Sequence, residues 1–209
     1  MSENLIEIIK EDKLYPIIRC SSAEEALTAG RAMIKGGIRV LEVNIETLEM
    51  FDVIKELSKE AYICAGSVIT TLQAQTALDC GAVMLSSPIF QMHMVKISKS
   101  KRVPLIAGVA TANEAYNAWK ARVPMTKLYP TSALGGANYI SDILRQMPFL
   151  NIMPTGNIKL DEVVSYIKAG AKCVGVGRDL YADFLPAEVS ERVRSTLSDI
   201  KDFVNWKNG

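Results

Sequence analysis

Apolar residues in this chain occur in short continuous runs that alternate with longer segments of helical periodicity. The apolar positions of segment 50–57 follow the i, i+3, i+4, i+7 spacing of one helix face, and those of segment 163–170 repeat it. A regular alternation of strands and helices is typical of a parallel sheet whose strands are joined by crossover helices. Eight runs have the length and composition of buried strands: 15–19, 39–44, 62–66, 83–87, 103–108, 125–130, 151–155 and 173–177.

Start and stop signals support the helices between these runs. Ser21, Ser22 and Thr111 each have a glutamate three residues later, which is the spacing of a capping box. Gly81 and Gly170 each stand between a helical segment and the next strand, where a left-handed residue ends a helix. The helices are therefore expected to begin directly after the strands.

The number of strand and helix units decides which parallel sheet is expected. Eight units within about 190 residues predict an α/β fold of the (β/α)8 TIM-barrel type, as a single domain over residues 1–209. Segment 5–10 is expected to form a short amino-terminal helix, and segment 186–206 the last helix. No linker or shift in composition divides the chain. An open doubly wound sheet is the alternative, because the pattern alone does not show whether the sheet closes.

The charge balance excludes several classes of function. The 209 residues include 24 basic and 23 acidic ones, which leaves a formal net charge of +1 and no strong field to hold a nucleic acid or an anionic membrane surface. No apolar run reaches the ~20 residues that span a bilayer, and the first residues lack the basic region of a signal peptide. We therefore expect a cytoplasmic protein that binds neither nucleic acid nor membrane.

The cysteines and the histidine give little support to a metal site. Four cysteines lie far apart, without a C-x-x-C spacing, and His93 is the one histidine of the chain. His93 stands among methionines and is interpreted as a surface or packing residue. We expect no metal and no cofactor, and we expect carboxylates or lysines to carry the chemistry.

A carboxylate and an amine each stand inside an otherwise apolar strand. Glu42 lies in the run Val-Leu-Glu-Val-Asn at 40–44, and Lys127 lies in the run Met-Thr-Lys-Leu-Tyr at 125–129. Alternation along a strand places both side chains toward the barrel interior, and the second and sixth strands lie opposite each other. The two groups are therefore expected to converge over a ligand in the barrel mouth.

Two interpretations of this pair are open. A lysine desolvated by neighbours such as Met125 and Tyr129 is kept in its neutral form, which attacks a ketone or aldehyde to form a Schiff base. The alternative is a buried ion pair that only fixes the fold.

Polar residues also follow other strands, at the end of the barrel where active sites of this fold lie. Arg19, Ser67 and the turn at 155–157 fit the binding of an anionic substrate. Each also has a structural explanation, because Arg19 could neutralise Glu42, Ser67 could cap the following helix, and the turn could be an ordinary one.

The loop after the eighth strand is glycine-rich and ends in an arginine, in the run Val-Gly-Val-Gly-Arg at 174–178. In barrels that bind phosphates, the loops after the seventh and eighth strands supply backbone N–H donors. Gly177 would expose such a donor, and Arg178 would add a charge-assisted contact.

Together these residues resemble the aldolase family that cleaves 2-keto-3-deoxy-6-phosphogluconate and 4-hydroxy-2-oxoglutarate. The resemblance runs over nearly the full chain. The motifs that carry it are Pro16-Ile17-Ile18-Arg19, Gly36-Gly37-Ile38, Leu41-Glu42-Val43, Ala65-Gly66-Ser67-Val68, Ser87-Pro88, Gly108 with Thr111 and Glu114, Lys127-Leu128-Tyr129-Pro130, Gly135-Gly136, Pro154-Thr155-Gly156, and Ala169-Gly170 with Val174-Gly175-Val176-Gly177.

The resemblance implies a class I aldolase of carbohydrate metabolism, which is a metal-independent carbon–carbon lyase. Its small-molecule partners would be the keto acid pyruvate and an aldehyde. Lys127 would form the Schiff base with the keto carbon, and Glu42 would act as the acid and base. A homotrimer is implied as well. The positions implied to bind substrate are Arg19, Ser67, Pro88, Tyr129, Thr155, Gly156, Asn157, Gly177 and Arg178.

Several positions depart from the family pattern and concern the distal part of the substrate. Asn157 replaces the second glycine of a Pro-Thr-Gly-Gly turn, and Arg178 stands where a serine is usual. Glu46 occupies a position where many members have an arginine, and it would repel a nearby anion. Ile89 and Ala107 replace a glycine and a proline. An aldolase acting on an unphosphorylated keto or sugar acid is therefore one alternative, and a catalytically silent keto-acid-binding barrel is another.

Overall fold

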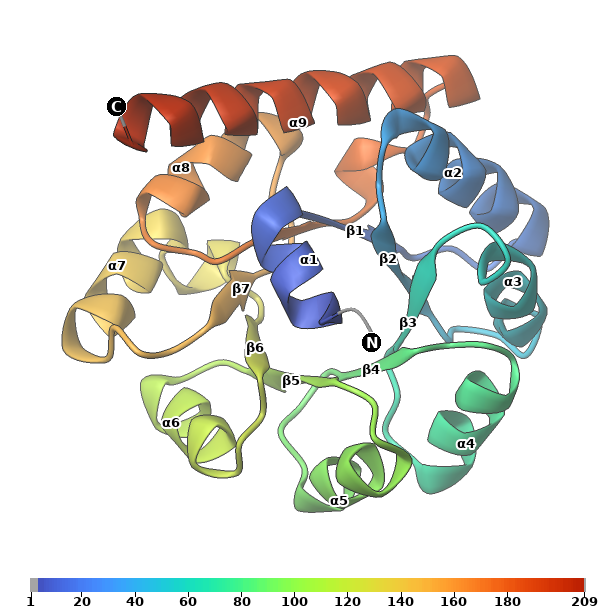
Figure 1. The fold of residues 1–209 in the computed structure, drawn as a ribbon, viewed down its shortest axis with the longest axis horizontal. Coiled ribbons are helices and arrows are strands. Elements are labelled where there is room, and N and C mark those ends of the chain that lie inside the picture. The colour runs from blue at the N-terminus through green and yellow to red at the C-terminus, as the bar shows by residue number, and fades with distance from the viewer. Residues whose placement is uncertain (1–3, 209) are drawn as a thin grey trace.

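The structure is a computed structural model that describes residues 4–208 of the chain, and side chains as far as Trp206. Its parallel strands form a ring surrounded by helices (Figure 1). The strands are β1 (Leu14–Ile18), β2 (Val40–Asn44), β3 (Tyr62–Gly66), β4 (Met84–Ser87), β5 (Leu105–Val109), β6 (Met125–Leu128), β7 (Ile152–Pro154) and β8 (Val174–Val176). The α-helices are α1 (Leu5–Asp12), α2 (Ala23–Gly36), α3 (Met50–Leu57), α4 (Thr71–Asp79), α5 (Met92–Lys101), α6 (Ala112–Lys120), α7 (Gly136–Gln146), α8 (Val163–Lys168) and α9 (Pro186–Asn208). Short 3-10 helices are η1 (Ser132–Leu134), η2 (Leu160–Glu162) and η3 (Arg178–Leu180).

The strand order shows that the sheet curves into a barrel. Each strand from β1 to β6 pairs in parallel with the next one in the chain, and β8 pairs with β1. The first and last strands are neighbours, so the predicted (β/α)8 barrel is confirmed and the open doubly wound sheet is wrong. Between β7 and β8 the described residues form no strand pairing, although the Lys172 N–H donates to the Ile152 carbonyl at 3.0 Å. The barrel is therefore closed except for a seam between these two strands.

Side chains along each strand alternate between two apolar layers. Leu41 and Val43 of β2 point outward and belong to the core between the strands and the surrounding helices. Val40 belongs to a second cluster inside the barrel, together with Tyr15 and Cys64. This alternation confirms the prediction that Glu42, which lies between the two outward residues, faces the barrel interior.

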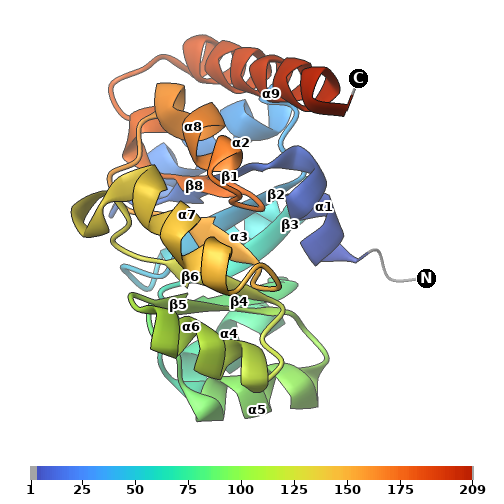
Figure 2. The same ribbon diagram turned by 90° about the vertical axis from the view of Figure 1, so that its left-hand side faces the viewer.

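The first and last helices cover different parts of the barrel. Helix α1 lies over the end of the barrel at which the strands begin (Figures 1 and 2), and its Ile9 is buried in the interior cluster. Helix α9 lies across α2 and α8 (Figure 1), and its Ser190 hydroxyl donates to the Ala32 carbonyl of α2 at 2.8 Å. Both predicted terminal helices are confirmed, and the opposite end of the barrel is left open for a site.

The helix start signals are confirmed in part. Ser22 caps α2 through the Glu25 N–H, and Thr111 and Glu114 form a complete capping box at α6, whereas Ser21 is not a cap because it precedes the N-cap residue. Strand β6 ends at Leu128, two residues earlier than predicted, where Pro130 has no N–H to continue the ladder.

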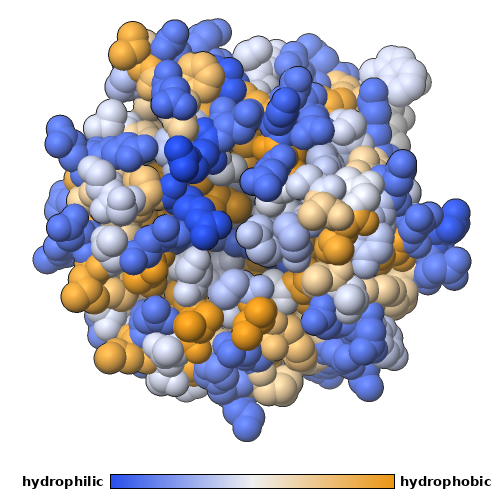
Figure 3. Space-filling view, turned by 180° about the vertical axis from the view of Figure 1, so that it is seen from behind, coloured by the Kyte–Doolittle hydropathy of each residue, from blue (hydrophilic) through white to orange (hydrophobic). Residues whose placement is uncertain are grey.

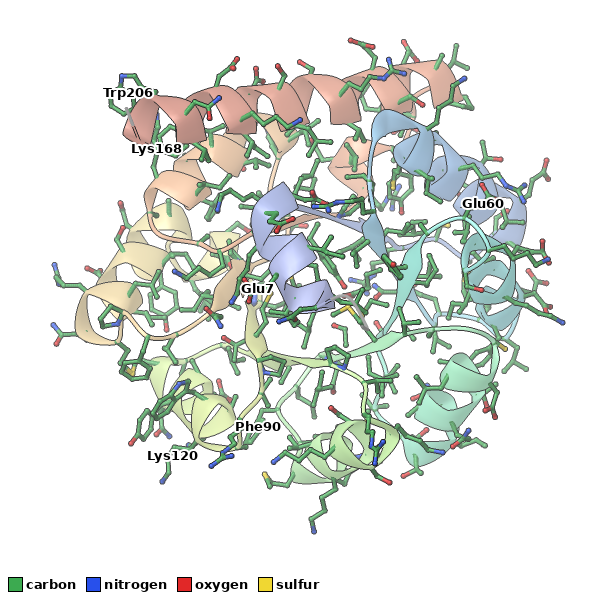
Figure 4. The ribbon with its side chains drawn as sticks, viewed as in Figure 1. Glu7, Glu60, Phe90, Lys120, Lys168 and Trp206 are labelled. Atoms are coloured by element: carbon green, nitrogen blue, oxygen red, sulfur yellow. The ribbon has the colours of Figure 1, made fainter. Side chains whose placement is uncertain are left out.

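Charged side chains lie around the outside of the molecule. Figure 4 shows Glu60 and Lys120 on the outer rim and Lys168 near Trp206 at the end of α9. The Lys168 ammonium lies 5.4 Å from the centroid of the Phe203 ring, so α8 and α9 are joined by a cation–π contact.

Candidate active site

A cavity of about 890 Å³ opens at the carboxyl ends of the strands. Figure 3 looks onto this face, where strongly hydrophilic side chains gather beside the centre and several apolar ones lie on the half away from α9. All the residues that the sequence singled out as catalytic or substrate-binding line this one cavity: Arg19, Glu42, Ser67, Pro88, Lys127, Tyr129, Thr155, Gly156, Asn157, Gly177 and Arg178.

The floor of the cavity is a lysine and a carboxylate from opposite sides of the barrel. Lys127 of β6 donates from Nζ to both oxygens of Glu42 of β2, at 2.5 and 2.6 Å. The side chains are 10% and 1% exposed, so the pair is almost completely removed from bulk water yet reaches the cavity. The predicted convergence of these two groups is confirmed.

A glycine on the neighbouring strand makes room for the carboxylate. Gly66 of β3 lies beside Asn44 in the parallel register, and a Cβ at Gly66 would lie 2.5 Å from Glu42 Oε1 and 2.7 Å from Glu42 Cγ. The same Cβ would collide with Asn44 Oδ1. Glu42 therefore packs closely against the backbone of β3 at Gly66.

The groups below the pair are neutral. Burial raises the pKa of the Tyr15 phenol and of the Cys64 thiol, and the negative charge of Glu42 adds to both effects. Burial also raises the pKa of the Cys173 thiol. Proton transfer at the cavity floor is therefore left to Lys127, Glu42 and whatever enters from the cavity.

Arg19 does not neutralise Glu42, which was the structural explanation considered for it. Its Nε donates to Glu46 at 2.9 Å, and the Glu46 carboxylate raises the pKa of the guanidinium. The backbone of Arg19 is held by Tyr181, whose hydroxyl accepts from the N–H at 2.8 Å and donates to the carbonyl at 2.9 Å. Glu46 is thus paired with a cation at the cavity mouth, so its repulsion of an anion is reduced.

The two hydroxyl residues of the cavity are placed by local backbone geometry. Ser67 has a left-handed backbone with φ 60°, directly after β3. It does not cap the following helix, because Thr70 and Gln73 form the capping box of α4. Thr155 is buried after β7, and its N–H donates to the Leu128 carbonyl at 2.9 Å. Both residues line the cavity, and the Thr155 hydroxyl donates at 3.5 Å to the same Leu128 carbonyl.

The loops after β7 and β8 present backbone donors to the cavity. Among the described residues, the N–H groups of Asn157, Ile158, Arg178 and Asp179 make no hydrogen bond. Asn157 adopts a left-handed backbone with φ 53°, a conformation that asparagine tolerates, so its side chain replaces a glycine without ending the turn. This arrangement is able to bind an anion through main-chain groups.

The position of Tyr129 does not agree with the prediction that this side chain desolvates Lys127. It follows β6 and lies at the rim of the cavity, 44% exposed, against the turn at Gly156. Lys127 is buried by the barrel interior, where Met125 lies one layer below it. Tyr129 is not turned inward, because β6 ends at Leu128.

Several lining residues were not identified from the sequence. Asn44 is buried with an unpartnered Oδ1, and its position two residues after Glu42 is the signal that could have identified it. Lys159, Asp183 and Phe184 also line the cavity, from loop segments whose path the strand pattern does not determine.

Within residues 4–208, no group of three or more histidine, cysteine or acidic residues could hold a metal ion. Over the same residues, no helix is both long and apolar enough to cross a bilayer.

The fold and the cavity floor define a (β/α)8-barrel protein with a buried lysine–carboxylate pair at the catalytic end. A profile of the KDPG and KHG aldolase family matches residues 5–194, and the chain belongs to this family. The 2-dehydro-3-deoxy-phosphogluconate aldolase of Treponema pallidum is 31% identical over 166 residues, which cover 78% of this chain and 79% of that protein. The KHG/KDPG aldolase of Escherichia coli K12 is 27% identical over 190 residues, 89% of either chain.

Solved structures agree on the fold. A crystal structure of KDPG aldolase from Legionella pneumophila, with pyruvate captured as a covalent carbinolamine intermediate, superposes with a TM-score of 0.84. The two chains are 24% identical, and the match covers 94% of this chain and 99% of that one. The family resemblance, the barrel fold and the class of carbon–carbon lyase predicted from the sequence are therefore confirmed.

Proposed function

We propose that this aldolase cleaves a 2-keto-3-deoxy-6-phospho sugar acid to pyruvate and a phosphorylated aldehyde, with Lys127 as the Schiff-base residue. The observation that carries the proposal is the bidentate contact of the Lys127 amine with Glu42 at the cavity floor. A nucleophilic amine must lose a proton before it attacks, and a carboxylate in contact with it is placed to accept that proton. The alternative of a purely structural ion pair does not explain why the pair lines an open cavity.

The reaction can be followed atom by atom. Glu42 takes a proton from the Lys127 ammonium, and the free amine adds to the C2 carbonyl of the substrate. Nζ passes one of its protons to the alkoxide so formed, Glu42 returns its own proton to the resulting hydroxyl, which leaves as water, and the lone pair of Nζ forms the iminium. Glu42 then accepts the proton of the C4 hydroxyl, the C3–C4 bond breaks, and its electrons pass into the iminium to give an enamine and the aldehyde. Protonation of the enamine at C3 and hydrolysis release pyruvate and restore the amine.

The remaining cavity residues would bind the two ends of the substrate. Ser67, Thr155 and Arg19 would contact the keto-acid part, and Tyr129 and Pro88 would flank it. The free N–H groups of the loops after β7 and β8, with Gly156, Asn157, Gly177 and Arg178, would bind the phosphate.

4-Hydroxy-2-oxoglutarate is the second candidate substrate. Its distal group is a carboxylate, which the same backbone donors would bind, and the acidic side chains of Asp179 and Asp183 in this part of the cavity favour an anion of lower charge. An unphosphorylated sugar acid places a hydroxyl there and needs no anion site.

A substrate panel tests the proposal. Pyruvate release is measured from 2-keto-3-deoxy-6-phosphogluconate, 4-hydroxy-2-oxoglutarate and unphosphorylated 2-keto-3-deoxygluconate, with Lys127→Arg as the inactive control and with a chelator to test metal independence. We expect release from the phosphorylated substrate at the highest kcat/KM, unchanged by the chelator. No release from any of the three would support the silent keto-acid-binding alternative.

We further propose that the protein acts as a cytoplasmic homotrimer. Exposed apolar side chains occur on the loops and helices that follow β2, β3 and β4, among them Leu48, Leu72 and Ile89, and contact with further copies would bury them. The four cysteines are all free, as in proteins of a reducing compartment. Light scattering of the purified protein gives its mass in solution.

A further inference from the structure

The seam between β7 and β8 lies below two loops that line the cavity. The strands on its two sides form no pairing within the described residues. Packing fills the seam instead, because the Thr155 methyl group occupies the space where a Cβ of Gly175 would lie. The loop after β7, at 155–159, and the loop after β8, at 177–184, rise from its two sides and both line the cavity.

A single carboxylate bridges the two loops above the seam. Asp179, in η3 after β8, accepts through Oδ2 from the Leu160 N–H at 2.8 Å, and Leu160 begins η2 after β7. A carboxylate that accepts from a backbone N–H at a helix start forms a charge-assisted hydrogen bond. This contact joins the two loops where strand pairing is missing.

An arginine from the last helix holds the bridge in place. Arg192 of α9 donates to the Asp179 carbonyl at 2.8 Å and to the Leu180 carbonyl at 3.3 Å. Its guanidinium lies 3.7 Å from Asp179 Oδ2 and 4.0 Å from the centroid of the Phe184 ring. All four contacts are to the loop after β8, so Arg192 fixes both the backbone and the carboxylate of that loop.

We infer that Asp179 and Arg192 are positioning residues for the distal part of the substrate. They fix the spacing of the backbone N–H donors on the two loops. This spacing must match the terminal group on the aldehyde half of the substrate. Glu42, Ser67 and Lys127 lie on or directly after β2, β3 and β6, which are held by continuous strand pairing rather than by the bridge. Loss of the bridge therefore weakens binding of the aldehyde half and leaves the chemistry on pyruvate intact. The inference rests on the proposed function.

The experiment compares two reactions in four variants. Asp179→Ala removes the acceptor, Asp179→Asn keeps an oxygen acceptor without charge, and Arg192→Ala removes the arginine contacts. Arg194→Ala is the matched control, because Arg194 lies on the same helix in an exposed pair with Glu191. Cleavage of 2-keto-3-deoxy-6-phosphogluconate gives KM and kcat, and deuterium exchange into the pyruvate methyl group reports on Lys127 and Glu42 without an aldehyde. Thermal unfolding confirms that each variant is folded.

For Asp179→Ala and Arg192→Ala we expect KM to rise about tenfold or more with kcat within about twofold, the size expected for one charge-assisted hydrogen bond. Asp179→Asn should recover part of the affinity, and Arg194→Ala should match the unchanged protein. Pyruvate exchange should stay within about twofold in all four. Unchanged KM in both folded variants, or exchange that falls in parallel with cleavage, overturns the inference. Absence of exchange in the unchanged protein overturns the proposed function and the inference with it.

Discussion

Lys127 of β6 and Glu42 of β2 meet across the barrel interior, with Nζ 2.5 and 2.6 Å from the two carboxylate oxygens. Neither residue has an opposite charge on its own strand. The carboxylate holds the amine toward the cavity and is the only acidic group that lies within hydrogen-bond distance of it among the described residues. Orientation of the nucleophile and removal of its proton are thus assigned to one residue.

Glu42→Gln separates these two roles. The amide keeps one oxygen as an acceptor for Lys127 but takes up no proton, so the variant should still bind pyruvate while kcat for cleavage falls by about 10²-fold or more. Cleavage kinetics and pyruvate binding at equilibrium are measured on the same preparation. Full activity of the variant would reduce Glu42 to a structural counter-ion.

Gly66→Ala moves the carboxylate without changing its chemistry. The new Cβ would lie 2.5 Å from Glu42 Oε1, so Glu42 must leave its position over β3. Misplacement of a catalytic group by about 1 Å costs on the order of 10²-fold in rate, and kcat should fall by that amount. Thermal unfolding separates a loss of fold from a loss of geometry. A folded variant with unchanged kcat would show that the position of Glu42 is not critical.

Arg178→Ser tests the cation at the distal end of the cavity. If Arg178 contacts the phosphate, KM for the phosphorylated substrate should rise by a factor that corresponds to about 1.5 to 3 kcal/mol, with little change for an unphosphorylated one. An improved KM for the phosphorylated substrate would mean that the arginine fills the site instead. Kinetics that the substitution leaves unchanged for both types of substrate would place Arg178 outside the substrate contacts.

The capping box of α6 predicts a pH dependence of stability. The Ala110 and Thr111 N–H groups donate to the Glu114 carboxylate and lower its pKa below the ordinary value of 4.5. Because the folded pKa is lower than the unfolded one, this stabilisation is present above pH 4.5 and is lost as the pH falls through the folded pKa. Glu114→Gln should cost about 0.5 to 1 kcal/mol in the free energy of unfolding at pH 7, and the difference should shrink toward pH 3. A difference in unfolding free energy between the two proteins that stays the same from pH 7 to pH 3 would contradict this prediction.

Much of the barrel could be predicted because its signals are local. The apolar runs, the alternation that turns Glu42 inward and the box at Thr111 and Glu114 all depend on neighbouring residues. Convergence of Glu42 and Lys127 followed once eight strands were counted, since opposite strands face each other.

The parts that were not predicted depend on how distant segments meet. The pairing of Arg19 with Glu46, the exposed rim position of Tyr129 and the bridge from Asp179 to Leu160 each join loops whose paths have no periodic pattern. Arg192 contacts the same loop from a helix that the sequence identified only as the last one. Loop geometry, rather than strand order, determines the distal cavity.

Reduction with borohydride in the presence of pyruvate tests the central claim most directly. The hydride converts the iminium into a stable secondary amine, so the modified lysine is identified by peptide mass mapping. Lys127→Arg is the control, because a guanidinium stays protonated and forms no Schiff base. We predict that pyruvate is attached to Lys127 with the other lysines essentially untouched, and that Lys127→Arg is not labelled. An unlabelled protein, or label spread over surface lysines, would contradict the assignment of Lys127 as the nucleophile.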